Sequence, residues 1–310
     1  MMRDEEWLLK EKYDGELGAP GFAADCARLE AGEPLAYVIG WQPFLGLQIW
    51  LDSKPLIPRP ETEYWVEKLL EKVERSESEY AETSAAERSR ESASGWPPED
   101  TGGAGMVGRS DGRRAERGRA RRHAEALTRF PHALIREAPI RFLDLCAGSG
   151  AIGCVALAWL PNARVYFGEL DPAHETTIRK NIRENGLDGS RADVRIGDLF
   201  APFGALTFDV IAANPPYIPA GRALDASVAE HEPHAALFAV NDGLALIRRI
   251  ASELPHRLNP GGVAYVECDS AHAERARALF AASGMRAQIM HDQYDVPRVI
   301  VVRRERNENA

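Results

Sequence analysis

The chain has 310 residues, of which 45% are hydrophobic and 27% charged, and its formal net charge is −9. This composition is typical of a soluble globular protein, and the acidic balance argues against a general binder of nucleic-acid phosphates. No apolar run reaches membrane-spanning length and the start MMRDEEWLLK has no signal-peptide core. We therefore expect a cytoplasmic protein, with a mitochondrial location as the alternative.

Residues 1–75 carry the patterns of ordered structure. Apolar side chains at 7–9 and between 22 and 29 predict two short helices. In the stretch 45–58, LGLQIWL predicts a strand, DSK a turn and PLIP a returning extended segment. Thr62 is then the expected cap of the next helix. The sequence thus predicts a small N-terminal helical and hairpin region.

The composition changes abruptly after residue 75. Residues 76–125 are rich in Ser, Glu, Arg, Gly and Ala and almost lack branched aliphatic side chains. Such a segment cannot bury enough apolar surface to offset its chain entropy, so we predict disorder there. Its basic half can contact nucleic acid or ribosomes, but a solvated linker is the favoured interpretation.

Residues 138–304 alternate strand and helix signals, which implies βαβ units and a mostly parallel sheet. The expected strands are 140–147, 163–170, 192–199, 208–214, 261–268, 286–292 and 297–303, and the expected helices are 151–159, 172–185, 241–257 and 271–283. The last two strands follow each other closely, so one of them is expected to run antiparallel.

The glycine-rich stretch FLDLCAGSGAIG (142–153) follows the first of these strands and opens a helix. Its glycines match a dinucleotide-binding fingerprint and let a ligand approach the backbone. Glu169 ends the next strand, where a carboxylate can accept both hydroxyls of a ribose. NAD-dependent enzymes and S-adenosylmethionine-dependent enzymes both place an acid there, so these features leave the two classes open.

The stretch FDVIAANPPYIP (208–219) favours the second class. Two successive prolines donate no N–H to a sheet and hold Asn214 and Tyr217 on a rigid elbow. The Asn214 side-chain oxygen and the Pro215 carbonyl can accept both N–H bonds of an amide, so that its lone pair points at a methyl donor, while Tyr217 stacks on the flat group. A dehydrogenase has no need of this elbow. A simpler interpretation is that the strand stops at Pro-Pro and Asn214 caps the turn.

The four cysteines and the histidine pair give weaker signals. Without CxxC spacing, the cysteines indicate reduced thiols. His231 and His234 can ligate a metal, but no cysteine or third histidine lies near them in the sequence, so we expect no metal.

Three segments together resemble the release factor glutamine methyltransferase (HemK/PrmC) family: PLAYVIGWQPFLGLQIWLDSKPLIPRPETE (34–63), DLCAGSG (144–150) and NPPYI (214–218). The resemblance extends over 34–73 and 138–303. Asn-Pro-Pro-Tyr alone is shared with adenine N-methyltransferases, whereas IPRPETE is far more specific. The resemblance implies an α/β class I methyltransferase with a seven-stranded Rossmann-like sheet.

The resemblance also implies a division into 1–75 for substrate docking, 76–137 as a low-complexity insertion and 138–310 as the methyltransferase domain. The implied cofactor is S-adenosylmethionine. The implied substrate is the glutamine of the Gly-Gly-Gln motif of a peptide-chain release factor. We expect a monomer that uses no metal and contacts neither membrane nor nucleic acid directly.

Site residues follow from the same resemblance. Those implied for the cofactor are Asp144, Cys146, Ala147, Gly148, Ser149, Gly150, Glu169, Asp198, Leu199 and Asn214. Those implied to grip the glutamine amide are Asn214, Pro215, Pro216 and Tyr217. Those implied to admit the substrate are Arg59, Pro60, Glu61 and Thr62; a local salt bridge between Arg59 and Glu61 is the alternative.

The sequence departs from the family pattern in three places. Residues 1–33 are shorter than the usual helical domain, Cys146-Ala147 stands where glycine and threonine are commoner, and Glu169 replaces the usual Asp. Alternatives to the release-factor reading are a ribosomal-protein glutamine methyltransferase, an adenine N6-methyltransferase of DNA or RNA, and a catalytically silent scaffold.

Overall fold

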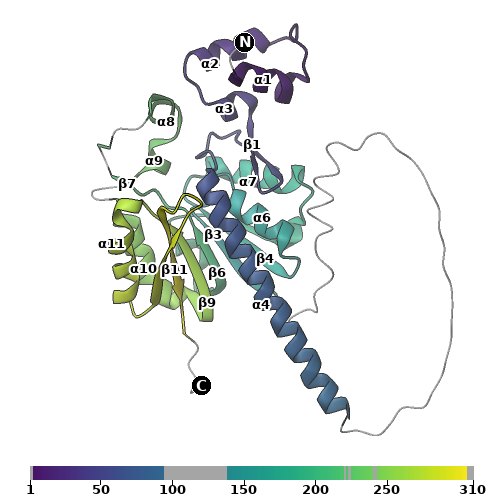
Figure 1. Cartoon of the computed structure of the whole chain (residues 1–310), viewed down its shortest axis with the longest axis vertical. Helices are drawn as coiled ribbons and strands as arrows, with labels where there is room; N and C mark the ends of the chain where they lie inside the picture. The colour runs from purple at the N-terminus through teal and green to yellow at the C-terminus, as the bar shows by residue number, and fades with distance from the viewer. Residues whose placement is uncertain (1–2, 94–137, 220, 223–224, 240–242, 306–310) are drawn as a thin grey trace, which may run out of the picture.

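The computed structural model describes residues 3–93, 138–219, 221–222, 225–239 and 243–305 (Figure 1). Helices α1 (Arg3–Tyr13), α2 (Phe22–Glu30) and α3 (Leu35–Ile39) form a small N-terminal cluster at one end of the molecule. The buried Asp25 carboxylate binds this cluster together, because it accepts from the Tyr13 hydroxyl and pairs with Lys12 and Arg28. The two helices predicted from the apolar spacing are confirmed.

The hairpin differs from the prediction. Strand β2 (Leu47–Trp50) pairs antiparallel with β1 (Trp41–Phe44), which precedes it, and the PLIP segment forms no strand. The turn residues Leu45 and Gly46 both have positive φ, 44° and 86°. Positive φ at both central residues is the geometry of a tight two-residue hairpin turn. Leucine rarely adopts positive φ, so the sequence did not predict a turn at Leu45.

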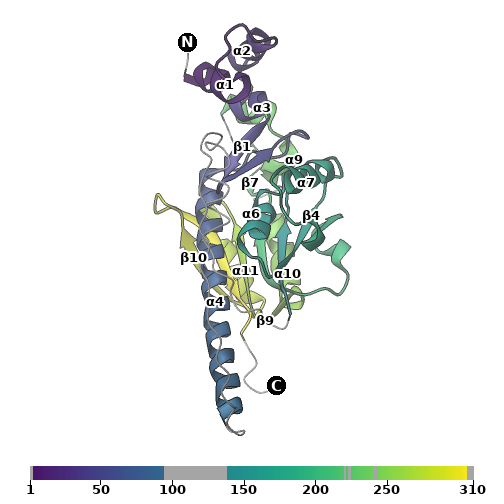
Figure 2. The same cartoon turned by 90° about the vertical axis from the view of Figure 1, so that its right-hand side faces the viewer.

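Helix α4 (Pro60–Ala93) is longer than expected at both ends. It begins at Pro60, where proline suits the first turn, so Thr62 lies inside the helix and is not its cap. It continues to Ala93, so the predicted disorder from residue 76 is wrong for 76–93; the remainder of that prediction lies outside the described residues. Figures 1 and 2 show the second half of α4 extending away from the body.

The central sheet has seven strands in the order β10-β11-β9-β6-β3-β4-β5. Their bounds are β3 (Ile140–Leu145), β4 (Ala163–Glu169), β5 (Ala192–Ile196), β6 (Phe208–Ala213), β9 (Leu258–Glu267), β10 (Arg286–His291) and β11 (Pro297–Arg303). Strand β11 is antiparallel to both of its neighbours, and the other pairings are parallel. The predicted α/β sheet, in which one of the last two strands of the chain runs antiparallel, is confirmed; that strand is β11, the second from the edge of the sheet.

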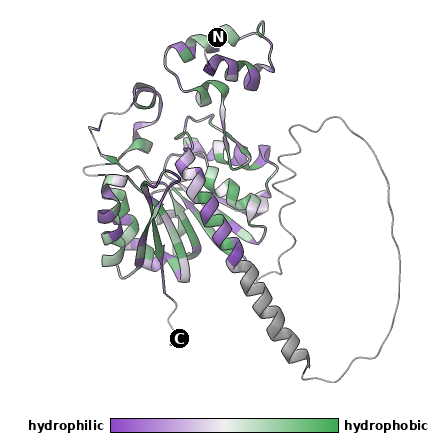
Figure 3. Ribbon diagram, viewed as in Figure 1, coloured by the Kyte–Doolittle hydropathy of each residue, from purple (hydrophilic) through white to green (hydrophobic). Residues whose placement is uncertain are grey.

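Helices cover both faces of this sheet. Their bounds are α6 (Ala151–Trp159), α7 (Ala173–Glu184), α10 (Ala245–Arg257) and α11 (Ala273–Ala282), with short 3₁₀ turns at Gly189–Arg191, Ala201–Phe203 and Ser270–His272. Strand residues alternate between two apolar clusters. Phe142 packs with α4 and α6 on one face, while Leu143 packs with α10 and α11 on the other. Figure 3 shows hydrophobic residues gathered along these strands.

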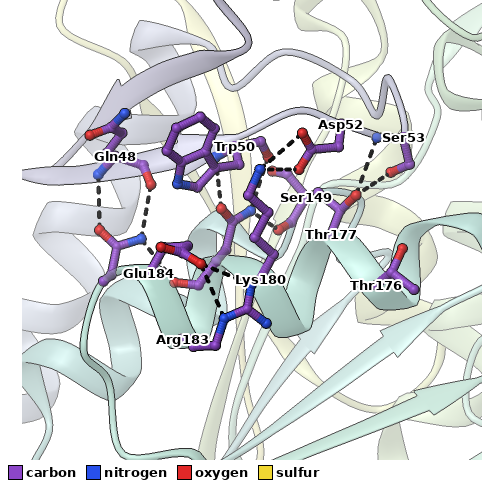
Figure 4. Close-up of polar contacts among 12 residues, drawn as sticks. Gln48, Trp50, Asp52, Ser53, Ser149, Thr176, Thr177, Lys180, Arg183 and Glu184 are labelled. Atoms are coloured by element: carbon purple, nitrogen blue, oxygen red, sulfur yellow. Dashed lines mark hydrogen bonds and ion pairs between the residues drawn. The ribbon is translucent and has the colours of Figure 1, made fainter.

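The hairpin is fastened to α7 by side chains one helical turn apart. The Asn181 and Asn185 amides each donate to one hairpin carbonyl and accept one hairpin N–H, at Trp50 and Gln48 respectively. Figure 4 shows Gln48, Trp50 and Ser53 lying over this helix, with Thr177 and Lys180 pointing toward them. The contact satisfies an edge of β2 that would otherwise present unpaired backbone groups.

A smaller group of elements lies beyond β6. It consists of the paired strands β7 (Ile218–Pro219) and β8 (Phe238–Ala239) with helices α8 (Ala226–His231) and α9 (His234–Leu237). These elements follow the Asn-Pro-Pro-Tyr elbow directly and bring Glu232 back toward the N-terminal region.

Candidate active site

The loops that follow four neighbouring strands meet at one edge of the sheet. Strands β6, β3, β4 and β5 are adjacent and parallel, so their carboxyl ends lie together. Backbone bonds join the loops that follow. Ala147 N–H donates to the Gly168 carbonyl at 3.0 Å, and Gly197 N–H donates to the Glu169 carbonyl at 2.8 Å.

The glycine loop owes its shape to positive φ angles. Gly150 has φ 77° at the start of α6, and Cys146 has φ 62°, which is uncommon for a residue with a side chain. The third glycine serves packing: a Cβ on Gly153 would lie 2.2 Å from the Phe167 ring. The loop therefore needs Gly150 for its conformation and Gly153 for the close approach of α6 to β4. At Cys146 it carries backbone strain of about 1–3 kcal/mol.

Asp144 lies behind the glycine loop. Its side chain is fully buried, and Oδ2 accepts the Gly153 N–H at 2.8 Å. Oδ1 is buried and has no hydrogen-bond partner in the part of the chain that the structure describes. Burial raises the pKa of the Asp144 carboxyl to about 8. Asp144 therefore holds the first turn of α6 against β3.

Glu169 is suited to a ribose. Its Oε2 accepts the Gly148 N–H at 2.7 Å and its Oε1 accepts the Asp171 N–H at 2.9 Å. A carboxylate has about four lone-pair directions, so each oxygen can still accept one hydroxyl. Above the loop there is room as well, since a Cβ on Gly148 would meet only Pro55, at 3.8 Å. The free lone pairs of Glu169 and the room above Gly148 fit a cofactor that carries a ribose, such as S-adenosylmethionine.

The next strand end contributes two of the predicted residues. Leu199 is buried with φ 47°, and the Asp198 carboxylate pairs with Arg249 at 2.8 Å. A left-handed leucine is strained, which indicates a turn held by its surroundings. The loop that carries Asp198 and Leu199 lies next to Glu169, because the N–H of the preceding residue, Gly197, donates to the Glu169 carbonyl.

The Asn-Pro-Pro-Tyr elbow begins directly after β6. The Asn214 Nδ2 donates to the Thr62 hydroxyl at 3.4 Å, and its Oδ1 is buried without a hydrogen-bond donor among the described residues. Tyr217 donates its hydroxyl to Glu267 Oε1 at 2.9 Å, and burial raises the pKa of that phenol well above its usual value. The elbow thus presents an unpaired carboxamide oxygen beside a fixed aromatic ring.

A cavity of about 210 Å³ opens beside this elbow. It is lined by Leu56, Arg59, Asn214, Pro215, Tyr217, Ile218, Asp225, Val228, Ala236 and Leu237. Mostly apolar walls with a few polar groups are typical of a site that recognises a small, partly polar side chain. Pro216, Pro60, Glu61 and Thr62 are not among the lining residues, and Thr62 is only 3% exposed.

Arg59 pairs across the chain and not locally. Its guanidinium bonds to Glu232 at 2.5 Å, and the other Glu232 oxygen accepts the Ile57 N–H at 3.2 Å. The alternative of a local salt bridge with Glu61 is therefore wrong. The neighbouring Glu63 instead accepts the Leu45 N–H at 2.6 Å. The segment 57–59 is thus held against α8 and α9 by a carboxylate that is itself buried.

Sequence reasoning missed two carboxylates of this site. Glu267 accepts from Thr62, Trp65 and Tyr217, while Glu232 holds Arg59. Glu267 ends strand β9, so its place at a strand carboxyl end was a usable signal. Glu232 lies between the two histidines considered as metal ligands, and nothing in the sequence marks its partner. Within the described ranges, no group of three or more potential ligands could hold a metal, and no helix is both long and apolar enough to cross a membrane.

Comparisons with known proteins find methyltransferases, among them several release factor glutamine methyltransferases. The Methyltransferase small domain model matches residues 130–243. A release factor glutamine methyltransferase of Geobacter sulfurreducens is 31% identical over 260 residues, 83% of this chain and 68% of that protein. Another, of Bordetella pertussis, is 31% identical over 303 residues, 95% of this chain and 86% of that protein. A ribosomal protein uL3 glutamine methyltransferase of Bradyrhizobium diazoefficiens is 39% identical over 123 residues, 39% of this chain and 38% of that protein.

Proposed function

Because the chain belongs to the release factor glutamine methyltransferase family and is an S-adenosylmethionine-dependent methyltransferase, we propose that it methylates the side-chain amide nitrogen of the glutamine in the Gly-Gly-Gln motif of a peptide-chain release factor. When bound, S-adenosylmethionine supplies an activated methyl group on its sulfonium. The protein's own task is to orient a poor nucleophile toward that methyl group, because the lone pair of an amide nitrogen is delocalised into its carbonyl.

The observation that carries this proposal is the Asn214 carboxamide: the residue lines the cavity, and its Oδ1 is buried without a hydrogen-bond donor among the described residues. An unpaired buried acceptor costs about 1–3 kcal/mol, which an incoming N–H group would offset. In the proposed complex, Asn214 Oδ1 accepts one N–H of the glutamine amide and the Pro215 carbonyl accepts the other. With both N–H bonds held in the amide plane, the lone pair, which lies perpendicular to that plane, can face the methyl group; the nitrogen releases one of its two N–H protons to solvent as it gains the methyl group.

The ring of Tyr217 supports the same assignment. It lines the cavity next to Asn214, and its hydroxyl is fixed by Glu267. A fixed ring can stack on a planar amide and hold it in place. Arg59, also on the cavity wall, is proposed to admit the substrate tip, whereas residues 60–62 do not line the cavity.

A methyl-transfer assay with labelled S-adenosylmethionine tests the proposal. The acceptors are a release factor, its variant with the motif glutamine replaced by alanine, ribosomal protein uL3, and duplex DNA. We expect label on the release factor and none on its glutamine-free variant. Label on uL3 alone would assign the chain to ribosomal-protein methylation, and label on DNA would mean that the elbow holds adenine.

The variant Asn214→Ala tests the mechanism. Loss of one oriented hydrogen-bonding group in a catalytic site costs about 10²–10³ in kcat, so we expect at least a hundredfold lower kcat. Binding of S-adenosylmethionine, measured by calorimetry, should remain within about threefold of the wild type, because residues 146–150 and Glu169 carry most of that proposed site. Asn259→Ala is the matched control, since its amide binds Asp209 and lies outside the cavity lining. Turnover by Asn214→Ala equal to that of this control would refute the mechanism.

A further inference from the structure

We propose that Glu267 is a positioning residue, which sets the orientation of the Asn214 carboxamide through the Thr62 hydroxyl and holds Tyr217 with its other oxygen. The inference deepens the proposed function, on which it rests only for the role of the Asn214 oxygen toward a substrate amide. The orientation of the carboxamide is a property of the protein and can be measured without substrate.

Glu267 lies where three elements meet. It ends β9, which runs parallel to β6 with Val266 opposite Ala213, so it sits beside the start of the elbow at Asn214. Helix α4 passes over this point and presents Thr62 and Trp65, which are three residues apart and so share one face. The side chain is 1% exposed, so its hydrogen bonds do not compete with solvent.

The Glu267 carboxylate accepts from three donors among the described residues. Oε2 receives the Thr62 hydroxyl at 2.7 Å and the Trp65 indole N–H at 2.8 Å, and Oε1 receives the Tyr217 hydroxyl. An indole N–H can only donate, and an ionised carboxylate can only accept. Burial raises the pKa of Glu267, whereas the three donors, followed by the charge of Arg298, favour its ionised form. The net direction of this pKa is upward, but the proton assignment rests on geometry: Oε2 already accepts the Trp65 indole N–H, and as an acceptor it receives the single hydroxyl proton of Thr62 at 2.7 Å.

The direction of that proton decides what Thr62 offers to Asn214. A hydroxyl that has given its only proton to Glu267 can act only as an acceptor toward a second neighbour. The Asn214 amide group must therefore turn its NH₂ to Thr62, as it does at 3.4 Å, and its Oδ1 away from Thr62. In the flipped carboxamide, Oδ1 would face the Thr62 hydroxyl oxygen, and both of these atoms are acceptors. Its NH₂ would face the N–H groups of the substrate amide. The network thus selects the orientation in which Asn214 can accept a substrate proton.

Four variants separate positioning from simple structural support. Thr62→Val removes the hydroxyl without changing side-chain shape, and Glu267→Gln puts a donor where the network needs acceptors. Thr62→Ser keeps the hydroxyl. Trp65→Phe removes a bond of nearly equal length to the same oxygen, but this bond is not on the path to Asn214.

We expect kcat on the release factor to fall at least tenfold in Thr62→Val and Glu267→Gln, while KM for S-adenosylmethionine changes less than threefold. Thr62→Ser should restore kcat to within threefold of the wild type. Trp65→Phe should lower the melting temperature at least as much as Thr62→Val, yet lower kcat less than threefold. The idea is overturned if kcat follows the melting temperature across all four variants, or if Thr62→Val retains full turnover.

A second measurement is independent of substrate. In protein labelled with ¹⁵N-asparagine, the Asn214 side-chain signal is identified by its loss in Asn214→Ala. Its NH₂ protons should exchange with solvent at least tenfold faster in Thr62→Val and Glu267→Gln than in the wild type or Thr62→Ser. If the wild type does not methylate a release factor, the proposed function fails while this readout still decides the orientation. Equal exchange in all variants would overturn the inference itself.

Discussion

Asp144, Glu169 and Glu267 lie near the carboxyl ends of three strands, and their carboxylates differ in the donors that they meet. In the described part of the chain, Asp144 accepts from the Gly153 N–H, Glu169 from two backbone N–H groups, and Glu267 from three side chains. Each added donor offsets more of the cost of burying a charge. We therefore assign Asp144 to loop support, Glu169 to a cofactor ribose and Glu267 to side-chain positioning.

The raised pKa of Asp144 predicts a specific dependence of stability on pH. Burial raises this pKa from 3.8 to about 8. Between these two pH values, the folded protein therefore holds a proton that the unfolded chain has released. The stability contribution is complete below the unfolded pKa and is lost as the pH rises through the folded pKa, by at most about 1.4 kcal/mol per pH unit. The melting temperature of the wild type should therefore fall between pH 5 and pH 8, relative to that of Asp144→Asn.

Asp295→Asn, at an exposed turn, is the control for this measurement and should parallel the wild type throughout. If Asp144→Asn also parallels the wild type, the carboxyl is ionised in the folded protein across this range, and the assignment of a neutral Asp144 is wrong.

At the scale of elements, the contact between the hairpin and α7 depends on a match of repeats. Asn181 and Asn185 are one turn apart on the helix, about 6 Å along its axis, and alternate strand residues are about 6.6 Å apart. The two amides therefore meet Trp50 and Gln48 as a neighbouring strand would. Asn181 also donates to the Ser149 carbonyl at 2.8 Å, so this contact reaches the glycine loop.

The pair offers a matched test. Asn181→Ala and Asn185→Ala each remove the bonds to one hairpin residue, so both should lower the free energy of unfolding, by about 1–3 kcal/mol. Only Asn181→Ala releases Ser149, so only this variant should weaken S-adenosylmethionine binding, by about fivefold or more, in a calorimetric titration. Equal affinities in the two variants would show that the hairpin contact does not shape the cofactor loop.

The sequence predicted the sheet well because each buried strand is a short apolar run between helical patterns. It failed where local conformation ran against residue preference. Leu45 adopts positive φ in the hairpin turn, so the pairing of β2 was assigned to the wrong side. In 76–93 the low apolar content suggested disorder, whereas alanine, glutamate and arginine are good helix formers and α4 continues through them.

The residues of the candidate site likewise fall into those that the sequence predicted and those that it missed. Asn214 and Glu169 lie in motifs whose spacing along the chain is itself the signal. Glu267 and Glu232 act on partners far away in sequence, 205 residues for Thr62 and 173 residues for Arg59. Such pairs depend on how α4, β9 and α8 pack together, which no local pattern records.

At the scale of the whole molecule, the two ends of the 76–137 stretch lie close together. Ser76 and Ile140 line one cavity of about 240 Å³ beside the middle of α4. The last buried side chain described on α4 is Val73. The second half of α4 points away from the sheet (Figure 2). Every buried side chain and every residue of the candidate site described above lies outside 77–93.

Deleting 76–125 should consequently leave the fold intact, because the twelve residues 126–137 can readily span the short distance between the cut ends. We expect a melting temperature within about 3 °C of the wild type and kcat within about twofold, measured by calorimetry and methyl transfer. A larger fall in melting temperature would show that the deleted stretch contributes to the core. The matched control is a Gly-Ser segment of equal length in place of 76–125.

The hydrogen bonds on Glu267 have a consequence for how the chain can be divided. Its donors Thr62 and Trp65 come from before the 94–137 stretch, whereas Tyr217 and Glu267 itself come from after it. Neither part alone holds all the donors and the acceptor of this network, and every residue of the candidate site described above lies outside 94–137. Two separately expressed fragments, cut near residue 110 and each fused to one member of an interacting pair, would form a complementation reporter in which methyl transfer records their encounter.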